Sequence, residues 1–111
     1  MAIPHAAPGQ AVDVLPLGAA LAGASTHALF KARHLEVIRL VLRAGQSLPP
    51  HRVAGEITVH CLEGAIELGV DGQRVALRAG QLAYLPAQAV HDVRAIEDAS
   101  ALLTIALAVG A

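Results

Sequence analysis

Two histidines, His51 and His91, stand in contexts that could bring their imidazole rings together. His51 follows Pro49 and Pro50, which favour an extended backbone and would hold His51 at the start of a strand. His91 begins a later apolar run, after the loop that contains Pro86. In a small barrel, inward side chains from different strands converge at the mouth. Two imidazoles placed there could share a metal ion, or bind and protonate a ligand.

The elements that must position these histidines are short strands. From residue 28 onward, short apolar runs alternate with turn signals, a spacing typical of an all-β sandwich or barrel. Asp71-Gly72, between two such runs, predicts a tight hairpin. The predicted strands are residues 29–31, 35–42, 57–62, 65–70, 73–77, 82–85, 91–96 and 101–109.

Two stretches of this chain resemble the paired motifs of the cupins. Residues 45–64, GQSLPPHRVAGEITVHCLEG, are similar to G-x5-H-x-H-x(3,4)-E-x6-G. Residues 80–95, GQLAYLPAQAVHDVRA, are similar to G-x5-P-x-G-x2-H-x3-N. The resemblance covers about residues 28–109. It implies a small single-domain cupin of the conserved-barrel type, whose fold is an all-β, antiparallel double-stranded β-helix or jelly-roll barrel.

The resemblance also implies a metal held by three histidines and one glutamate or glutamine, but this chain departs from that set. Val53 and Ile57 occupy two of the four ligand positions, and neither side chain can coordinate a metal. His51 and His91 alone make a weak site for iron, manganese, nickel or zinc, because protein sites usually supply three or more ligands. A metal site would need an atypical third ligand, such as Glu56, His34 or Cys61.

The alternation of side chains along a strand indicates which of these residues share a face. Val59 and Cys61 fall on the face of Ile57, whereas Glu56 and His60 fall on the opposite face. Only a bulge would turn Glu56 inward. We therefore predict an apolar pocket with the two histidines as polar anchors. Its predicted lining is His51, Val53, Ile57, Val59, Cys61, Tyr84, Leu85 and His91.

Composition excludes several other classes of function. Eight basic and nine acidic residues leave a net charge of −1, which argues against a nucleic-acid partner and against a polybasic membrane patch. A single cysteine excludes an internal disulfide. No apolar run approaches the ~20 residues of a membrane span, and residues 1–5 show no basic region followed by an apolar core, as a secretory signal would. We expect a cytoplasmic protein without a membrane partner.

Residues 1–26 are expected to form an N-terminal arm, and residues 27–111 the barrel. The arm is rich in proline and glycine and carries one charged side chain, Asp13. It is predicted to contain a short strand at 11–15 and a short helical turn near 19–22. The arm and the last strand are more apolar than one small barrel needs. We therefore expect a homodimer with arms or strands crossing between subunits, as the resemblance to small cupins also implies.

Three functions remain open at the level of the sequence, because the cupin fold hosts many unrelated activities. The first is binding of a small organic ligand in the barrel, without a full metal site. The second is a metal-dependent oxygenase, isomerase or lyase that uses His51, His91 and an atypical third ligand. The third is a structural or regulatory module.

Overall fold

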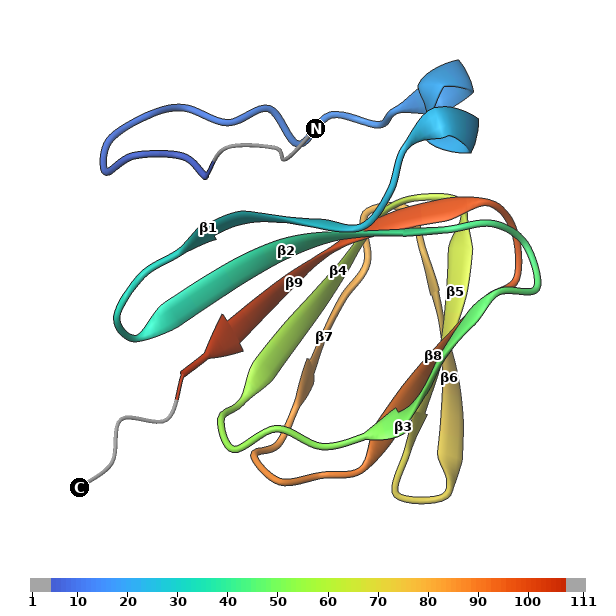
Figure 1. The fold of residues 1–111 in the computed structure, drawn as a ribbon. Helices are drawn as coiled ribbons and strands as arrows, with labels where there is room; N and C mark the ends of the chain where they lie inside the picture. The colour runs from blue at the N-terminus through green and yellow to red at the C-terminus, as the bar shows by residue number, and fades with distance from the viewer. Residues whose placement is uncertain (1–4, 108–111) are drawn as a thin grey trace.

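The computed structural model describes residues 5–107, which form two antiparallel β-sheets packed face to face (Figure 1). One sheet has five strands in the order β1-β2-β9-β4-β7, and the other has four in the order β3-β8-β5-β6. The predicted all-β, antiparallel jelly-roll fold is confirmed. The elements are the 3-10 helix η1 (Gly18–Gly23) and the strands β1 (His27–Lys31), β2 (Leu35–Leu42), β3 (Ser47–His51), β4 (Ile57–Glu63), β5 (Ala65–Val70), β6 (Gln73–Arg78), β7 (Leu82–Leu85), β8 (His91–Ala95) and β9 (Ala99–Ala106).

The strand that the sequence did not predict is β3, which contains Pro49 and Pro50. Proline lacks an N–H and is confined to places where a strand needs no donor, such as a sheet edge. β3 is an edge strand of the four-stranded sheet, which explains why the two prolines are tolerated. His51 therefore ends a strand, and the prediction that it begins one was wrong.

Two predictions for the arm had different outcomes. The predicted strand at 11–15 is wrong, because those residues join no ladder. The predicted helical turn near 19–22 is confirmed by η1, where Leu21 is buried. The last predicted strand extends to residue 109, and its end lies outside the described residues; β9 itself ends at Ala106.

The core lies between the two sheets and follows the two-residue period of the strands. On β4, Ile57, Val59 and Cys61 are buried, as their predicted common face requires. They pack with inward residues of the neighbouring and facing strands into one cluster. The other members of this cluster are Leu40, Leu42, Ile66, Leu68, Leu77, Leu85, Val93, Ala95, Ala99 and Ala101.

The two ends of the sandwich differ in how their main chains are joined. At one end, the connections from β2 to β3, β4 to β5, β6 to β7 and β8 to β9 cross between the sheets and bond to one another. Gly45 N donates to Ala95 O at 2.9 Å, Gly80 N to Cys61 O at 2.8 Å, and Ile96 N to Ala65 O at 2.9 Å. We call this the closed end. The opposite end, formed by the loops 52–56 and 86–90 and by the β5–β6 hairpin, is the open end (Figure 1).

The β5–β6 hairpin confirms the prediction made from Asp71-Gly72. Val70 pairs with Gln73, so these two residues alone form the loop. Their φ angles are 50° and 77°, and a type I′ turn requires a positive φ at both positions. Glycine adopts this conformation without cost, and aspartate is among the residues that tolerate it.

The arm passes over the five-stranded sheet and places its first described residues beside β1 (Figure 1). Ala6 N donates to Leu29 O at 2.8 Å, which occupies part of the outer edge of β1. Within residues 5–107 we find no helix that is long and apolar enough to cross a membrane.

Gly64 provides the first testable prediction, because two separate constraints meet there. Its φ is +72°, and a Cβ at this position would lie 2.0 Å from the main-chain oxygen of Asp98. The matched control is Gly80, whose φ is +89° but around which a Cβ would meet nothing within 4 Å. Gly80→Ala should lower the free energy of unfolding by about 1–2 kcal/mol, the cost of a left-handed alanine.

Gly64→Ala should cost more than about 4 kcal/mol or prevent folding, because main chain rather than a flexible side chain must move. Urea unfolding of both variants measures the difference. Equal losses would show that the close approach to Asp98 carries no energy.

Candidate functional site

His51 and His91 meet at the open end because β3 contains a bulge. Leu48 lies opposite Val93, and His51 lies opposite His91, so β3 has two residues where β8 has one. In a regular ladder Pro50 would face His91, and His51 would point to the other side of the sheet. With the extra residue, the two imidazole ring centroids lie 4.3 Å apart at an interplanar angle of 60°. The two histidines do converge, as predicted, but they do so through a bulge in β3 that the sequence did not reveal.

Each imidazole is oriented by its own main chain. The Nδ1 atoms of His51 and His91 lie 3.0 Å from Pro49 O and 3.1 Å from Ala89 O. A carbonyl oxygen only accepts, so each Nδ1 carries the proton and donates it. When a ring carries only this proton, its Nε2 keeps a free lone pair. His27 makes the same local bond to Ser25 O, so the bond fixes a ring but does not by itself mark a site.

The two rings differ in how much solvent they meet. His91 is only 5% exposed, whereas His51 is exposed. Val70 lies opposite His91 on the other side of β8 and packs against the core. Val53, also partly buried against the core, accepts a hydrogen bond at 3.0 Å from Gln88 N, which ties the loop 86–90 to the loop after β3. The pair therefore combines a solvent-facing ring with a buried one beside apolar side chains.

The donor side chains do not make the four-ligand metal set implied by the resemblance. Val53 and Ile57 offer no coordinating atom at the two further positions. Within residues 5–107, no three His, Cys, Asp or Glu side chains are grouped as metal ligands would be. Glu56 is exposed and lines a shallow depression on the outer face, and His34 is exposed between β1 and β2. Neither joins the histidine pair.

Cys61 points inward, as predicted, but it lies at the closed end. Its thiol contacts Glu63 O at 3.5 Å and Gly64 O at 3.7 Å. Cys61 lies four positions after Ile57 on β4, or ~13 Å along the strand. Burial raises the pKa of the Cys61 thiol, so it stays protonated and is a poor nucleophile or ligand. Cys61 therefore belongs to the core and does not line a site with the histidines.

The remaining predicted lining residues divide between the two faces of the sheet. Ile57, Val59 and Leu85 are buried in the core, and Val53 packs against it. Tyr84 is 65% exposed on the outer face, so its predicted place in the pocket was wrong. The reason is register: Tyr84 pairs with Thr58, and Leu85 pairs with the inward residue Ile57. The side chains between the two sheets below the histidines form the hydrophobic core.

The family of this chain follows from comparison with known proteins. The family model described as "Cupin domain" matches residues 38–109, well over half of the chain. The chain belongs to the cupin family. No curated protein matches this cupin.

Solved structures resemble this cupin over most of its length. An RmlC-like cupin from Desulfovibrio desulfuricans is 30% identical, with a TM-score of 0.68 over 73% of this chain and 79% of that one. A conserved protein of unknown function from Streptococcus pyogenes is 20% identical, with a TM-score of 0.76 over 99% and 97%. A cupin superfamily protein from Desulfitobacterium hafniense is 17% identical, with a TM-score of 0.72 over 75% and 76%. The last two likenesses bear on the fold alone.

This cupin also departs from the family pattern at Gln88, which occupies the glycine position of the second motif. Its φ is +65°, in the left-handed region that favours glycine. Gln88 lies one residue before Ala89, whose carbonyl orients His91. A strained non-glycine residue therefore lies in the loop that fixes the buried ring, as occurs at functional sites.

Replacing Gln88 tests that strain. Gln88→Gly should raise the free energy of unfolding by about 1 kcal/mol, because glycine adopts this φ without strain. Gln88→Ala, the control, keeps the unfavourable φ and should leave stability nearly unchanged. Thermal or urea unfolding measures both. A glycine variant no more stable than the alanine variant would mean that residue 88 is not strained.

Proposed function

We propose that this cupin binds a small organic ligand at the open end of its barrel, with His51 and His91 as the polar anchors. The observation that supports this most directly is the bulge in β3, which brings His51 opposite the buried His91 at a ring separation of 4.3 Å. Both Nδ1 atoms are already bonded to carbonyl oxygens, so the two Nε2 atoms are the groups left to meet a ligand.

The chemistry of the two rings indicates the class of ligand. A neutral Nε2 accepts a hydrogen bond, so the ligand should carry a hydroxyl or a carboxylic acid group. Each Nε2 can accept a hydrogen bond from one such O–H group, or take up its proton. Val53 and Val70, partly buried near the pair, would contact the apolar part of the molecule.

The alternative, a metal-dependent enzyme, has less support from the residues present. Two imidazole nitrogens supply half of the family's ligand set, and no third donor side chain of residues 5–107 joins them. The observation in its favour is the orientation of both rings by carbonyl oxygens, which is how proteins commonly hold metal-binding histidines. The two proposals differ in whether metal content follows the histidines.

His51→Ala and His91→Ala distinguish the proposals when they are compared with His60→Ala. His60 lies on β4 and pairs with Leu82 and Leu102, away from the open end, so it is the matched control. We expect wild-type protein purified without a histidine tag to contain well under one metal ion per chain by elemental analysis. In a screen of small hydroxy and carboxylic acids, each open-end variant should weaken a hit about 10-fold or more.

The control should leave affinity unchanged. Near-stoichiometric metal that is lost in both open-end variants would overturn the metal-free proposal in favour of the metal-dependent one. If neither metal nor ligand affinity responds, the open end has only a structural role.

A further inference from the structure

The turn that precedes His91 contains a residue whose backbone conformation suits glycine. Ala89 N donates to Pro86 O at 3.3 Å, which closes a β-turn with Gln88 at its third position. The φ of Gln88 is +65°, and turns with a positive φ at this position favour glycine or asparagine. In the described part of the chain, Asp71 is the other non-glycine residue with a positive φ, and aspartate tolerates this conformation. Gln88 therefore keeps a strain that glycine would relieve.

The fold uses the main chain of Gln88 but not its side chain. Gln88 N donates to Val53 O at 3.0 Å, and glycine at this position would make the same bond. The side chain is exposed, and its amide makes no hydrogen bond to another residue between 5 and 107. The side chain thus adds strain without a compensating bond inside the protein.

Three other glutamines show what a structural role requires in this protein. Gln10, Gln46 and Gln81 each accept, through Oε1, a hydrogen bond of 2.8 or 2.9 Å from the N–H group three residues earlier. Each of these side chains therefore stabilises a turn. Gln88 lies in a turn as well, but its side chain makes no such bond.

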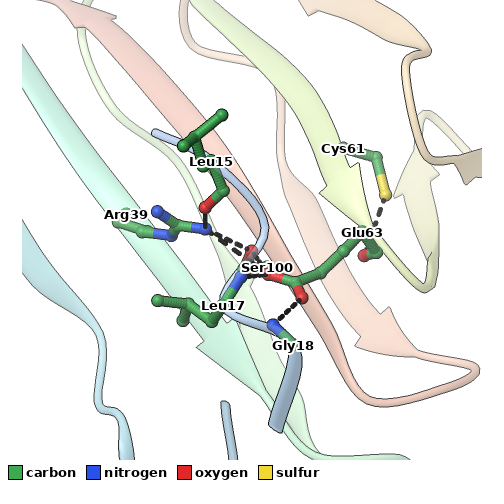
Figure 2. A network of polar contacts seen from close by, with 7 residues as sticks. All are labelled: Leu15, Leu17, Gly18, Arg39, Cys61, Glu63 and Ser100. Carbon is green, nitrogen blue, oxygen red and sulfur yellow. Dashed lines mark hydrogen bonds and ion pairs between the residues drawn. The ribbon is translucent and has the colours of Figure 1, made fainter. Parts of the chain in front are cut away.

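The network around Glu63 shows the same commitment of polar groups to the fold (Figure 2). The two oxygens of Glu63 accept from the N–H groups of residues 17–18 at 2.8 and 3.0 Å, and one of them also accepts from the hydroxyl of Ser100. Arg39 Nη2 lies 3.4 Å from this carboxylate and donates to Ser100 Oγ at 3.1 Å. It also donates to Leu15 O at 2.5 Å. These bonds attach the arm to the barrel through its main chain, whereas the amide in the open-end turn has no partner of this kind.

Gln88 lies between the two histidines in the chain of main-chain bonds at the open end. Its N–H binds Val53, which follows His51 by two residues. The next residue, Ala89, accepts the hydrogen bond from His91 Nδ1 at 3.1 Å. The amide of Gln88 offers two N–H donors, whereas a neutral imidazole offers its Nε2 as an acceptor. The open end therefore presents an unused donor in the loop that orients the buried acceptor.

We propose that Gln88 is a specificity-determining residue, whose side-chain N–H donates to a carboxylate oxygen of the ligand while an imidazole Nε2 accepts the ligand's hydroxyl. This inference rests on the proposed function and narrows its ligand class to small hydroxy acids, which carry both groups. A hydrogen bond to an ionised acceptor is about twice as strong as one between neutral groups, so the amide favours a carboxylate over a neutral carbonyl. Strain that persists at a binding position is typical of functional sites, where stability is given up for a contact.

The experiment exchanges the donor at residue 88 for an acceptor and measures which ligand is preferred. The probes are mandelate and mandelamide, together with the smaller pair lactate and lactamide. Within each pair the hydroxyl and the apolar part are the same, and a carboxylate is replaced by an amide. We expect wild-type protein to bind each acid about 10-fold more tightly than its amide, by calorimetry at neutral pH.

Gln88→Glu should reverse this preference. The new carboxylate repels the acid and accepts a hydrogen bond from the N–H group of the amide, so the ratio of the two dissociation constants should change about 100-fold. Gln81→Glu is the matched control, because it makes the same change of charge at the closed end and keeps an oxygen for the N–H of Arg78. The control should leave the ratio as it is in wild type.

A second pair of variants separates the contact from the strain. Gln88→Met keeps the length of the side chain and the unfavourable φ but removes the amide, and Gln88→Gly removes both the amide and the strain. Both variants should bind the hydroxy acids about 10-fold more weakly. Urea unfolding should nevertheless show that the glycine variant is the more stable of the two.

The outcomes distinguish this inference from the proposed function. An acid-to-amide ratio that is unchanged in Gln88→Glu, or undiminished binding of the acids in Gln88→Met, would overturn the role of Gln88. If no hydroxy acid binds but another compound binds in a way that requires His51 and His91, the ligand class is wrong and the proposed function stands. Hydroxy-acid binding that survives both histidine variants, or a screen without any histidine-dependent ligand, would overturn both proposals.

Discussion

The alternation of side chains along each strand is the constraint on which the rest of this structure depends. One face of every strand must fill a core between two small sheets, and a shift of one residue moves a whole strand's side chains to the other face. β4 follows the rule from Ile57 to Cys61 and delivers Ile57, Val59 and Cys61 to the core, before its register shifts between Cys61 and Glu63. β3 breaks it once, and the extra residue places His51 with His91. The alternation of side chains therefore determines both which residues fill the core and which residues lie beside His91.

The two ends of the sandwich use this arrangement differently. At the closed end, main-chain bonds and close approaches, such as that between Gly64 and Asp98, leave little room for a ligand. At the open end, loops bond to each other at fewer points and carry the features that depart from the family pattern: two imidazoles without their usual partners and a strained Gln88.

How much could be predicted from the sequence depended on whether the signal was local. The hairpin at Asp71-Gly72 and the inward face of β4 follow from adjacent residues, and both predictions were right. The place of Tyr84 was wrong because its face is set by pairing with β4, which no local pattern reveals. β3 was missed because its two prolines are poor strand formers. The hydrogen bonds among Arg39, Glu63 and Ser100 join residues up to 61 positions apart, so nothing around Arg39 in the sequence predicts them.

Recognition of the arm through its main chain has a consequence for how this protein can evolve. The bonds from Arg39 and Glu63 constrain the path of residues 15–18 but not their side chains, apart from the positive φ at Gly18. Mutations can therefore accumulate in the arm while its attachment persists, and the family model begins only at residue 38. In related proteins, an arm attached in the same way would be recognised by a donor and an acceptor on the barrel at the positions of Arg39 and Glu63. The sequence of the arm itself would not reveal the relation.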